Sequence, residues 1–233
     1  MIRNIEIIVP FYNDFDNFKE FVRILDNFKS KNCKFLLIDN GSTENLILDF
    51  YEKSNQDNNN WRALRSETNL GFGGGVKFGI NNSDANYVGW MPGNLKVSPD
   101  NVIEIFDNID NLSNIDLIKC KRVGRSFIPK LKTIIFGILV SIFFQRILMD
   151  AGGTPNLINK KAYLEFKNSP NDFSFDMFIY FASKYKQYNI TRPPIFYNKR
   201  MYGESHWQKN FFSEVKLLYE IIKSKNIWIK YLN

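Results

Sequence analysis

The beginning of the chain alternates short apolar runs with a helical stripe. "IEIIVPFY" (residues 5–12) is a β-branched run ended by a proline, which is typical of a buried strand. "NFKEFVRILDNFKS" repeats apolar side chains three and four positions apart, which predicts an amphipathic helix. The stripe consists of Phe18, Phe21, Val22, Leu25 and Phe28. "KFLLIDNGST" predicts a second strand, and it closes on four polar or small residues, Asp39, Asn40, Gly41 and Ser42.

The same alternation continues along the chain. "TENLILDFYEK" predicts a helix capped by Ser42 or Thr43. "WRALRS" is a weaker strand pattern, "NLGFGGGVKFGINN" is rich in glycine, and "YVGWM" predicts another strand. In the second half, "NVIEIFDNI" and "DMFIYFASKYKQY" predict helices and "IDLIKCKRV" predicts a strand.

Strands that alternate with helices predict an α/β fold with a mostly parallel sheet covered on both faces. In such sheets, ligands bind beyond the carboxyl ends of the strands. We therefore expect one edge of the sheet to carry the polar and glycine residues at the strand ends. These are Tyr12, Asn13, Asp39, Gly71 and Asn94.

Two apolar segments allow either membrane contact or burial. The apolar part of "LKTIIFGILVSIFFQRILM", residues 134–144, is shorter than the roughly 20 residues needed to cross a bilayer, and Lys130, Lys132 and Arg146 bracket it. A helix lying in the membrane interface and a buried core helix fit this pattern equally well. The tail "FFSEVKLLYEIIKSKNIWIKYLN" allows the same two interpretations, with a helix packed on the domain slightly favoured.

Composition narrows the class of protein. A chain of 233 residues predicts one domain, here residues 1–210 with a first half to residue 100, followed by a helical, basic tail at 211–233. The formal net charge of +7 favours contact with phosphates, an acidic membrane or a nucleic acid. The two cysteines have no CxxC spacing, and the start of the chain has no leader pattern, so we expect a cytoplasmic location.

Four segments follow one another in a set order: "IIVPFYND", "LLIDNGSTE", "NLGFGGGVKFGI" and "YVGWMPGNLKVSPD". This order resembles the nucleotide-binding half of family 2 glycosyltransferases, which have the GT-A fold. Members of that family carry the motifs Pro-x-Tyr-Asn, Asp-Asp-Gly-Ser, Asn-x-Gly and Asp-x-Asp in the same order along the chain. The matching positions are Pro10, Tyr12, Asn13, Asp39, Gly41, Ser42, Asn69, Gly71 and Gly74.

The resemblance implies a donor site for a nucleoside diphosphate sugar. Asp39 would accept hydrogen bonds from the base or the ribose, and Tyr12 would offer a flat face beside the base. Glycines from Gly71 onward allow close backbone approach, and Lys77 would reach a phosphate. A flexible loop is the alternative interpretation of "GFGGG".

The second half resembles dolichyl- and polyprenyl-phosphate sugar synthases. "KRVGRSFIPK" is similar to their Arg-x-x-Arg stretch, and "RPPIFYNKRMYGESHW" to their Arg-x-x-Gly-x-Ser segment. The resemblance implies acceptor contacts by Arg122, Arg125, Asp150, Arg200 and Ser205. Arginines suit a phosphate because their planar fork holds two oxygens at once, whereas a solvated charged edge is the alternative for Arg122 and Arg125.

Asp176 matches the acidic position ahead of a helix in these enzymes. It would serve as general base for a hydroxyl acceptor, and helix capping is the competing account. His206, the only histidine, fits a surface or substrate contact better than a catalytic base. With one histidine and no acidic cluster beside it, a zinc site is disfavoured.

The segment "GWMPGNLKVSP" departs from the family where a metal would bind. The two carboxylates of Asp-x-Asp hold Mg²⁺ or Mn²⁺ against the diphosphate, but Pro92 and Asn94 stand in their places. Metal affinity should therefore be much reduced. Lys96, with Lys77, would then supply the positive charge directly and support catalysis.

The sequence thus predicts an inverting glycosyltransferase that uses a nucleoside diphosphate sugar and a lipid-linked or glycan acceptor, peripheral on the cytoplasmic face of the cell membrane. Inversion is implied by the resemblance alone. The rival hypothesis is a sugar-nucleotide-binding or scaffold subunit that has lost activity. Nucleic-acid binding is disfavoured because the aromatic residues fall mostly on buried stripes.

Overall fold

The structure is a computed structural model of the whole chain and describes residues 4–28, 30, 32–43, 60–109, 112–198 and 211–232, with the side chains of the last range from residue 218 onward. Its strands are β1 (Ile5–Phe11), β2 (Cys33–Asn40), β3 (Trp61–Ser66), β4 (Tyr87–Trp90), β5 (Leu117–Lys119), β6 (Lys121–Val123), β7 (Asn156–Asn159), β8 (Ile190–Thr191) and β9 (Pro194–Phe196). A seven-stranded sheet has the order β3-β2-β1-β4-β7-β5-β8, and β6 pairs with β9 in a second sheet.

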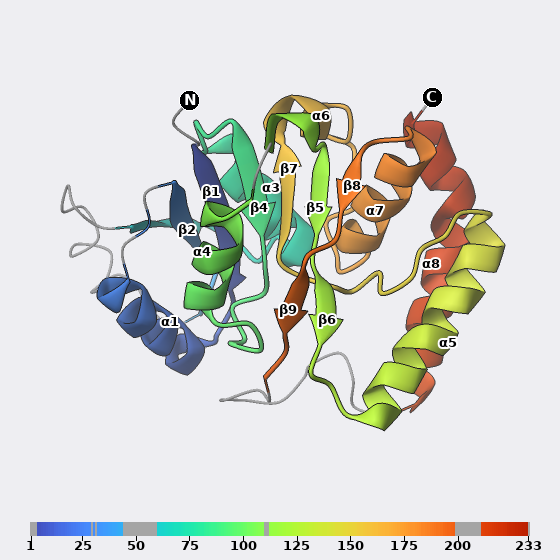
Figure 1. Cartoon of the computed structure of the whole chain (residues 1–233), viewed down its shortest axis with the longest axis horizontal. Coiled ribbons are helices and arrows are strands. Elements are labelled where there is room, and N and C mark those ends of the chain that lie inside the picture. The colour runs from blue at the N-terminus through green and yellow to red at the C-terminus, as the bar shows by residue number, and fades with distance from the viewer. Residues whose placement is uncertain are drawn as a thin grey trace.

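The described helices cover both faces of this sheet (Figure 1). They are α1 (Phe15–Asn27), α3 (Gly71–Asn81), α4 (Pro99–Asp107), α5 (Phe127–Phe144), α6 (Lys160–Leu164), α7 (Phe175–Tyr185) and α8 (Phe211–Leu232), with a 3-10 turn at Leu112–Asn114. One hydrophobic cluster joins α1 and α4 to one face of β1. A second cluster joins α3, α7 and α8 to the opposite face. The predicted α/β fold with helices on both faces is confirmed.

Most neighbouring strands are parallel, as predicted, with β7 as the exception. β1 pairs parallel with β2 and β4, and β2 pairs parallel with β3. β7 runs antiparallel to both β4 and β5. The predicted strand "IDLIKCKRV" is divided at Cys120, because β5 joins the large sheet and β6 joins the small one.

The amphipathic stripe of α1 is confirmed except at its end. Phe18, Phe21, Val22 and Leu25 are buried against β1. Phe28 lies past the last helical residue and is 42% exposed, so its predicted place on the stripe is wrong. The predicted helix "TENLILDFYEK" lies outside the described residues, except for its first residue, Thr43.

The glycine-rich segment forms the helix α3, so the flexible-loop interpretation is wrong. Its glycines bring the helix close to the sheet and to the loop before α7. A Cβ on Gly79 would lie 2.5 Å from Ile8 Cγ2, and one on Gly73 would lie 2.5 Å from the Pro170 carbonyl oxygen. Glycine lowers the stability of a helix by about 1 kcal/mol relative to alanine. Here the absence of a Cβ allows the close packing.

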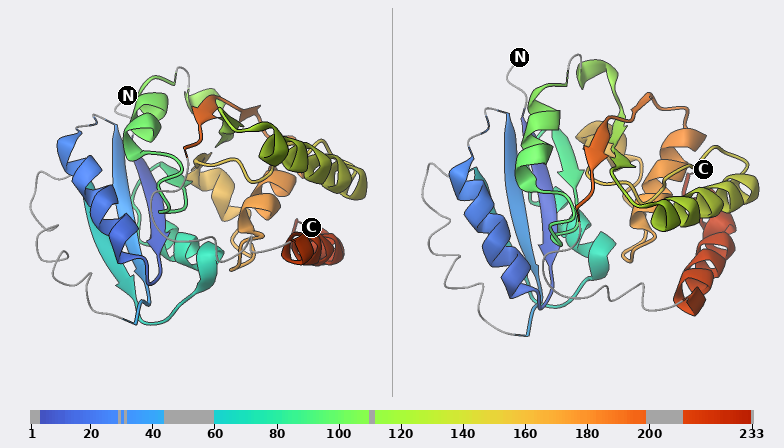
Figure 2. Two further views of the ribbon diagram at one scale, coloured as in Figure 1. Left: turned by 90° about the horizontal axis from the view of Figure 1, so that it is seen from below. Right: turned by 60° about the horizontal axis from the view of Figure 1, so that its bottom comes forward.

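The helix α5 lies at the edge of the molecule beside α8 (Figure 2). Its buried residues are Gly137, Val140 and Phe144, and only 17% of its apolar window is buried. The interpretation of this run as a buried core helix is therefore wrong. α8 packs on the main core through Ile221, Trp228 and Leu232.

Candidate active site

The carboxyl ends of β2, β1 and β4 lie side by side and carry the predicted donor residues. Asp39 is paired with Phe11 in the β1–β2 register, and Tyr12 follows directly. Beyond β4 the chain turns at Gly93, where a Cβ would lie 2.2 Å from Phe11 Cε1, so this turn rests on the end of β1. Tyr12, Asp39 and Asn94 therefore share one edge of the sheet, as predicted.

Asp39 is nearly fully buried and holds the turn that follows β2. Its Oδ1 accepts from the Ser42 backbone N–H at 3.0 Å, and its Oδ2 accepts from Arg65 Nη1 at 2.8 Å. Arg65 Nη2 also donates to the Ser42 carbonyl at 2.9 Å. The Asp39 side chain is 1% exposed and that of Arg65 is 30% exposed. Arg65 is therefore the partly exposed partner of a buried carboxylate, and the sequence patterns do not reveal this pair.

Asn13 links the end of β1 to the same turn. Its backbone N–H donates to Ser42 Oγ at 3.0 Å, and its Oδ1 accepts from the Thr43 backbone N–H at 2.9 Å. Asn13 has a φ of 48°, a left-handed conformation that asparagine tolerates better than most residues. The Pro-x-Tyr-Asn motif thus joins two strand ends, and Tyr12 remains 43% exposed between them.

Asn40, which stands where the family has an aspartate, joins β2 to the start of α3. Its Nδ2 donates to the Gly71 carbonyl at 3.0 Å, and its Oδ1 accepts from the Leu70 backbone N–H at 3.2 Å. An ionised aspartate could make only the second of these bonds. Gly71 has a φ of 73°, which places it in the left-handed region that glycine adopts without strain.

The turn after β4 does not supply a divalent metal site. Asn94 offers one neutral side-chain oxygen, which already accepts from the Lys96 backbone N–H at 3.2 Å, and Pro92 has no ligating side-chain atom. Among the described residues, no three His, Cys, Asp or Glu side chains gather as a metal-binding group. Lys96 itself lies on this turn, where its carbonyl accepts from the Asn198 backbone N–H at 2.8 Å.

Asp176 lies at the start of α7 and is joined to the end of β4 and to β7. Trp90 Nε1 donates to its Oδ1, and Asn156 Nδ2 donates to the same oxygen at 3.2 Å. Neither bond caps the helix, so helix capping does not account for this residue. Both bonds end on Oδ1, and no described residue donates a hydrogen bond to Oδ2.

Lys119 orients the amide that faces Asp176. Its Nζ donates to Asn156 Oδ1 at 3.2 Å and to the Gly153 carbonyl at 3.0 Å, which turns the Asn156 Nδ2 toward the carboxylate. Lys119 and Asn156 are each 1% exposed. We refer to Trp90, Lys119, Asn156 and Asp176 together as the Asp176 network.

Burial shifts the pKa values of both charged members of this network. Desolvation raises the pKa of Asp176, while the Lys119 ammonium and the Trp90 hydrogen bond oppose that rise. Desolvation lowers the pKa of Lys119 to about 8, and the Asp176 carboxylate opposes that change. A carboxylate with a raised pKa and an available oxygen is suited to accept a proton from an attacking hydroxyl.

Predicted acceptor residues gather where β6 begins. Arg122 Nε donates to Asp150 Oδ1 at 2.6 Å, and its backbone N–H donates to Oδ2 at 2.9 Å. Arg192 Nη2 lies 3.7 Å from the same carboxylate and was not predicted. Arg122 is therefore an ion-paired residue and not part of a solvated charged edge. The two arginines and one aspartate keep an excess of one positive charge.

Arg125 lies near enough to this ion-paired group to interact electrostatically with Arg122 and Asp150, and it also makes hydrogen bonds of its own. Its Nη2 donates to Thr133 Oγ1 at 2.6 Å and to the Pro129 carbonyl at 3.0 Å, at the start of α5. The remaining predicted acceptor residues, Arg200 and Ser205, lie outside the described residues, as does His206.

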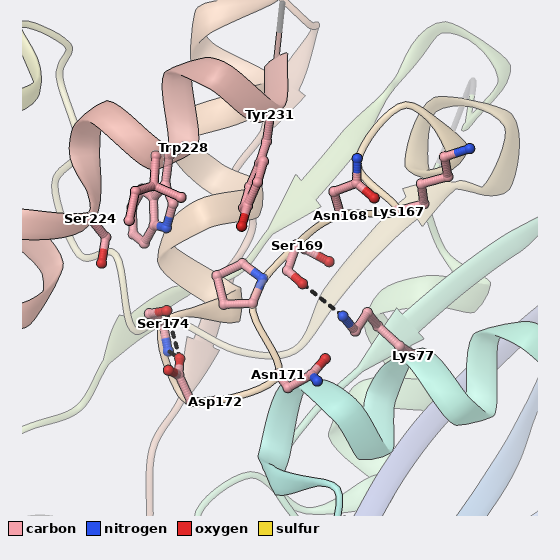
Figure 3. A pocket seen from close by; sticks show the side chains of 12 residues that line it. Lys77, Lys167, Asn168, Ser169, Asn171, Asp172, Ser174, Ser224, Trp228 and Tyr231 are labelled. Carbon is pink, nitrogen blue, oxygen red and sulfur yellow. Dashed lines mark hydrogen bonds between the residues drawn. The ribbon is translucent and has the colours of Figure 1, made fainter.

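Lys77 points away from the donor edge. It lies six residues into α3, about 9 Å along the helix from Gly71, and its Nζ donates to the Ser169 carbonyl at 2.7 Å. Partial burial lowers its pKa. It lines a hollow of about 500 Å³. Figure 3 shows Trp228 and Tyr231 of α8 across this hollow from Lys77. The structure thus does not bring Lys77 together with Asp39 and Tyr12.

Comparisons with known proteins agree with this architecture. The model of glycosyl transferase family 2 matches residues 6–188. No curated protein sequence matches the chain. Glucosyl-3-phosphoglycerate synthase from Mycobacterium tuberculosis, in complex with Mn²⁺, UDP-glucose and glycerol 3-phosphate, is similar with a TM-score of 0.66 and 10% identity, over 97% of this chain and 79% of that chain.

Two further solved structures have the same fold. The complex of the same synthase with Mn²⁺, UDP and glucosyl-3-phosphoglycerate gives a TM-score of 0.65 at 10% identity, over 97% of this chain and 79% of that chain. A structure described as a mycobacterial protein gives 0.63 at 11% identity, over 97% and 74%. At these identities the likeness concerns the fold.

Proposed function

Because this chain belongs to glycosyl transferase family 2 and is a glycosyltransferase with the GT-A fold, we propose that it moves a sugar from a nucleoside diphosphate to a hydroxyl group of a phosphate-bearing, lipid-linked acceptor. The attacking oxygen forms a bond to the anomeric carbon of the sugar. The bond from that carbon to the diphosphate breaks, and the nucleoside diphosphate leaves with the electron pair. This displacement inverts the anomeric centre.

The Asp176 network carries the proposal. A hydroxyl acceptor must lose its proton as it attacks, and in this proposal Asp176 Oδ2 takes that proton. Trp90 and Asn156 fix the other carboxylate oxygen, so the side chain has a defined orientation before substrate binds. Preorganisation of this kind supports catalysis because no hydrogen bonds need to rearrange at the moment of reaction.

Charges on the donor edge support diphosphate binding without a cation. Arg65 presents a guanidinium that Asp39 and the Ser42 carbonyl hold in place. Lys96 follows Asn94 on the turn after β4, where the family places its metal carboxylates. In a similar synthase structure the ligands include Mn²⁺ and UDP, whereas the described residues of this turn do not fit such an ion.

The charge of the group around Asp150 supports an anionic acceptor. Arg122 and Arg192 share Asp150 and leave one positive charge over, which suits an anionic group. The similar synthase was solved in complex with glycerol 3-phosphate, a phosphate-bearing molecule. The exposed apolar helix α5 begins a few residues after Arg122, and it favours an acceptor presented by a lipid and a peripheral position on the cytoplasmic membrane face.

The test is a transfer assay with a panel of uridine, guanosine and thymidine diphosphate sugars and polyprenyl-phosphate-linked acceptors, with products identified by mass spectrometry. We expect one donor to be consumed and Asp176→Asn to lower turnover by roughly 10²- to 10⁴-fold with donor affinity unchanged. An Asp176→Asn variant with full activity would mean that the attacking group is already anionic and would overturn the base role. Donor binding without turnover on any acceptor would favour the scaffold hypothesis, which the altered turn at Asn94 suggests.

A further inference from the structure

The helix α5 exposes a continuous apolar half to solvent. Its exposed side chains recur at helical spacing and lie opposite the residues that pack on the core. They are Phe127, Ile128, Leu131, Ile134, Ile135, Ile138, Leu139, Ile142 and Phe143. Phe127 is 76% exposed and Ile142 is 69% exposed. Apolar patches of this extent on soluble monomers mark interaction surfaces.

The length and composition of α5 would allow it to cross a membrane, with a mean hydropathy of 1.9 over 18 residues. Its connections argue against a crossing. After Gln145 the chain turns back along the helix, where the Leu148 backbone N–H donates to Ser141 Oγ at 2.9 Å. A Cβ on Gly137 would lie 3.0 Å from Met149 Sδ, so this return segment lies against the middle of the helix.

Charged groups tie both ends of α5 to the same globule. The ion pair of Arg122 and Asp150 joins the strand before the helix to the segment after it. Lys225 Nζ of α8 donates to the Phe143 carbonyl at 2.6 Å, near the other end. A crossing would carry these polar contacts into hydrocarbon, which is strongly unfavourable. An orientation in the plane of the membrane keeps them outside it.

The positive charge around α5 indicates which kind of partner surface would bind this helix. Residues 117–149 contain seven lysines and arginines and no acidic residue. Lys130, Lys132 and Arg146 are exposed on or beside the helix. A second copy of the chain docking on this half would bring two basic bands together. Anionic lipid headgroups instead complement them, while the acyl boundary takes the apolar half.

We propose that α5 is an in-plane membrane anchor, with its exposed apolar half in the acyl–headgroup boundary of an anionic bilayer and its basic residues among the headgroups. The inference deepens the proposed function, on which it rests only for the identity of the acceptor. The anchor starts a few residues from Arg122, so it would hold the acceptor side of the enzyme at the membrane surface where a lipid-linked substrate is found.

The test is co-sedimentation of the full chain with vesicles of phosphatidylcholine alone and of phosphatidylcholine mixed equally with phosphatidylglycerol. We expect binding to the mixed vesicles that weakens as salt is raised. Ile135→Glu with Ile142→Glu should lower the apparent affinity by about a hundredfold or more, because two exposed apolar side chains leave the contact. Leu164→Glu, an equally exposed apolar position on α6, is the matched control and should bind like the unchanged protein.

Three results would overturn the proposal. One is absence of binding to the mixed vesicles, and another is equal binding by the α5 variant with an unchanged melting temperature. The third is bound protein that resists extraction by alkaline carbonate, which would indicate a spanning helix. Self-association in sedimentation velocity that the α5 variant abolishes, without vesicle binding, would assign the surface to a second copy. Donor turnover measured without vesicles separates failure of the anchor from failure of the proposed function.

Discussion

Asp176 illustrates how single residues acquire a function from their neighbours. Burial raises the pKa of this carboxyl, which opposes its action as a base. The Lys119 ammonium and the Trp90 hydrogen bond lower its pKa against that tendency. We therefore propose that Lys119 is a positioning residue that acts on Asp176 through Asn156 and through its charge.

Lys119→Met should move the acidic limb of the kcat/KM profile to higher pH. Removing the ammonium takes away one of the influences that lower the Asp176 pKa, so a higher pH is needed to ionise the base. The direction of the shift follows from the loss of a nearby opposite charge. The measurement is the pH profile of transfer, with Lys121→Met, an exposed neighbour in β6, as control. A uniform loss of rate with an unmoved limb would contradict this role.

The same substitution has a consequence for stability. Lys119 has a pKa of about 8 in the fold and an ordinary value of 10.5, so the cost of burying its charge is present in full below pH 8. That cost disappears as pH rises to about 10.5, because the unfolded chain then also loses the proton. The unchanged protein should gain about 3 kcal/mol relative to Lys119→Met across this window. Urea unfolding at several pH values checks the gain, and parallel curves would refute it.

Arg65→Met should destabilise the fold and weaken donor binding together. Asp39 is 1% exposed, and without Arg65 it keeps one backbone donor, so about 1–3 kcal/mol of unfolding free energy should be lost. Arg23→Met removes an ion pair whose arginine side chain is 65% exposed and should cost less than about 1 kcal/mol. Thermal unfolding with and without nucleotide measures both effects. Equal losses for the two variants would count against the anchoring role of Arg65.

Sequence reasoning finds only part of such a site. Asp39 and Asp176 follow from motifs that each lie within a few neighbouring residues. Arg65 and Lys119 have roles that depend on partners 26 and 37 positions away, Asp39 and Asn156, which no local pattern connects. One signal was present, since a lysine inside the apolar strand "IDLIKCKRV" must be paired when buried.

Hydrophobic periodicity predicts the long and regular helices and strands. β1, β2 and α1 have runs whose burial follows the expected pattern. β7 is four residues long and follows "AGGTP", so its sequence is typical of a loop although it lies between β4 and β5. α3 shows the opposite case, where packing against Ile8 and the loop before α7 overrides a low helix propensity.

Gly79→Ala should destabilise the protein although alanine favours helices. The new Cβ would lie 2.5 Å from Ile8 Cγ2 in the centre of the sheet, and such overpacking costs about 1–3 kcal/mol. Asn81→Ala, at the exposed end of the same helix, tests propensity alone and should be neutral or slightly stabilising. Urea unfolding compares the two variants. A Gly79→Ala variant as stable as the unchanged protein would show that α3 packs less closely on β1.

The molecule has two distinct surfaces, a polar edge of the sheet and an exposed apolar helix. Polar residues gather at the carboxyl ends of β1, β2 and β4, and the Asp176 network lies beside them at the start of α7. The apolar half of α5 lies at the other end of the molecule beside α8 (Figure 1). The group formed by Arg122, Asp150 and Arg192 connects the two, because Arg122 precedes α5 and Asp150 follows it. This arrangement fits an enzyme that takes its donor from solution and its acceptor from a membrane.

We propose that this family 2 glycosyltransferase transfers sugar without a divalent cation, because Asn94 and Pro92 stand in place of the metal carboxylates and Arg65 and Lys96 are cationic residues at the same edge of the sheet. The most direct measurement is the initial rate of nucleoside diphosphate release, with acceptor present, in excess chelator and in added Mn²⁺. Equal rates are expected in both conditions. A rate that collapses in chelator and returns with Mn²⁺ would contradict the proposal.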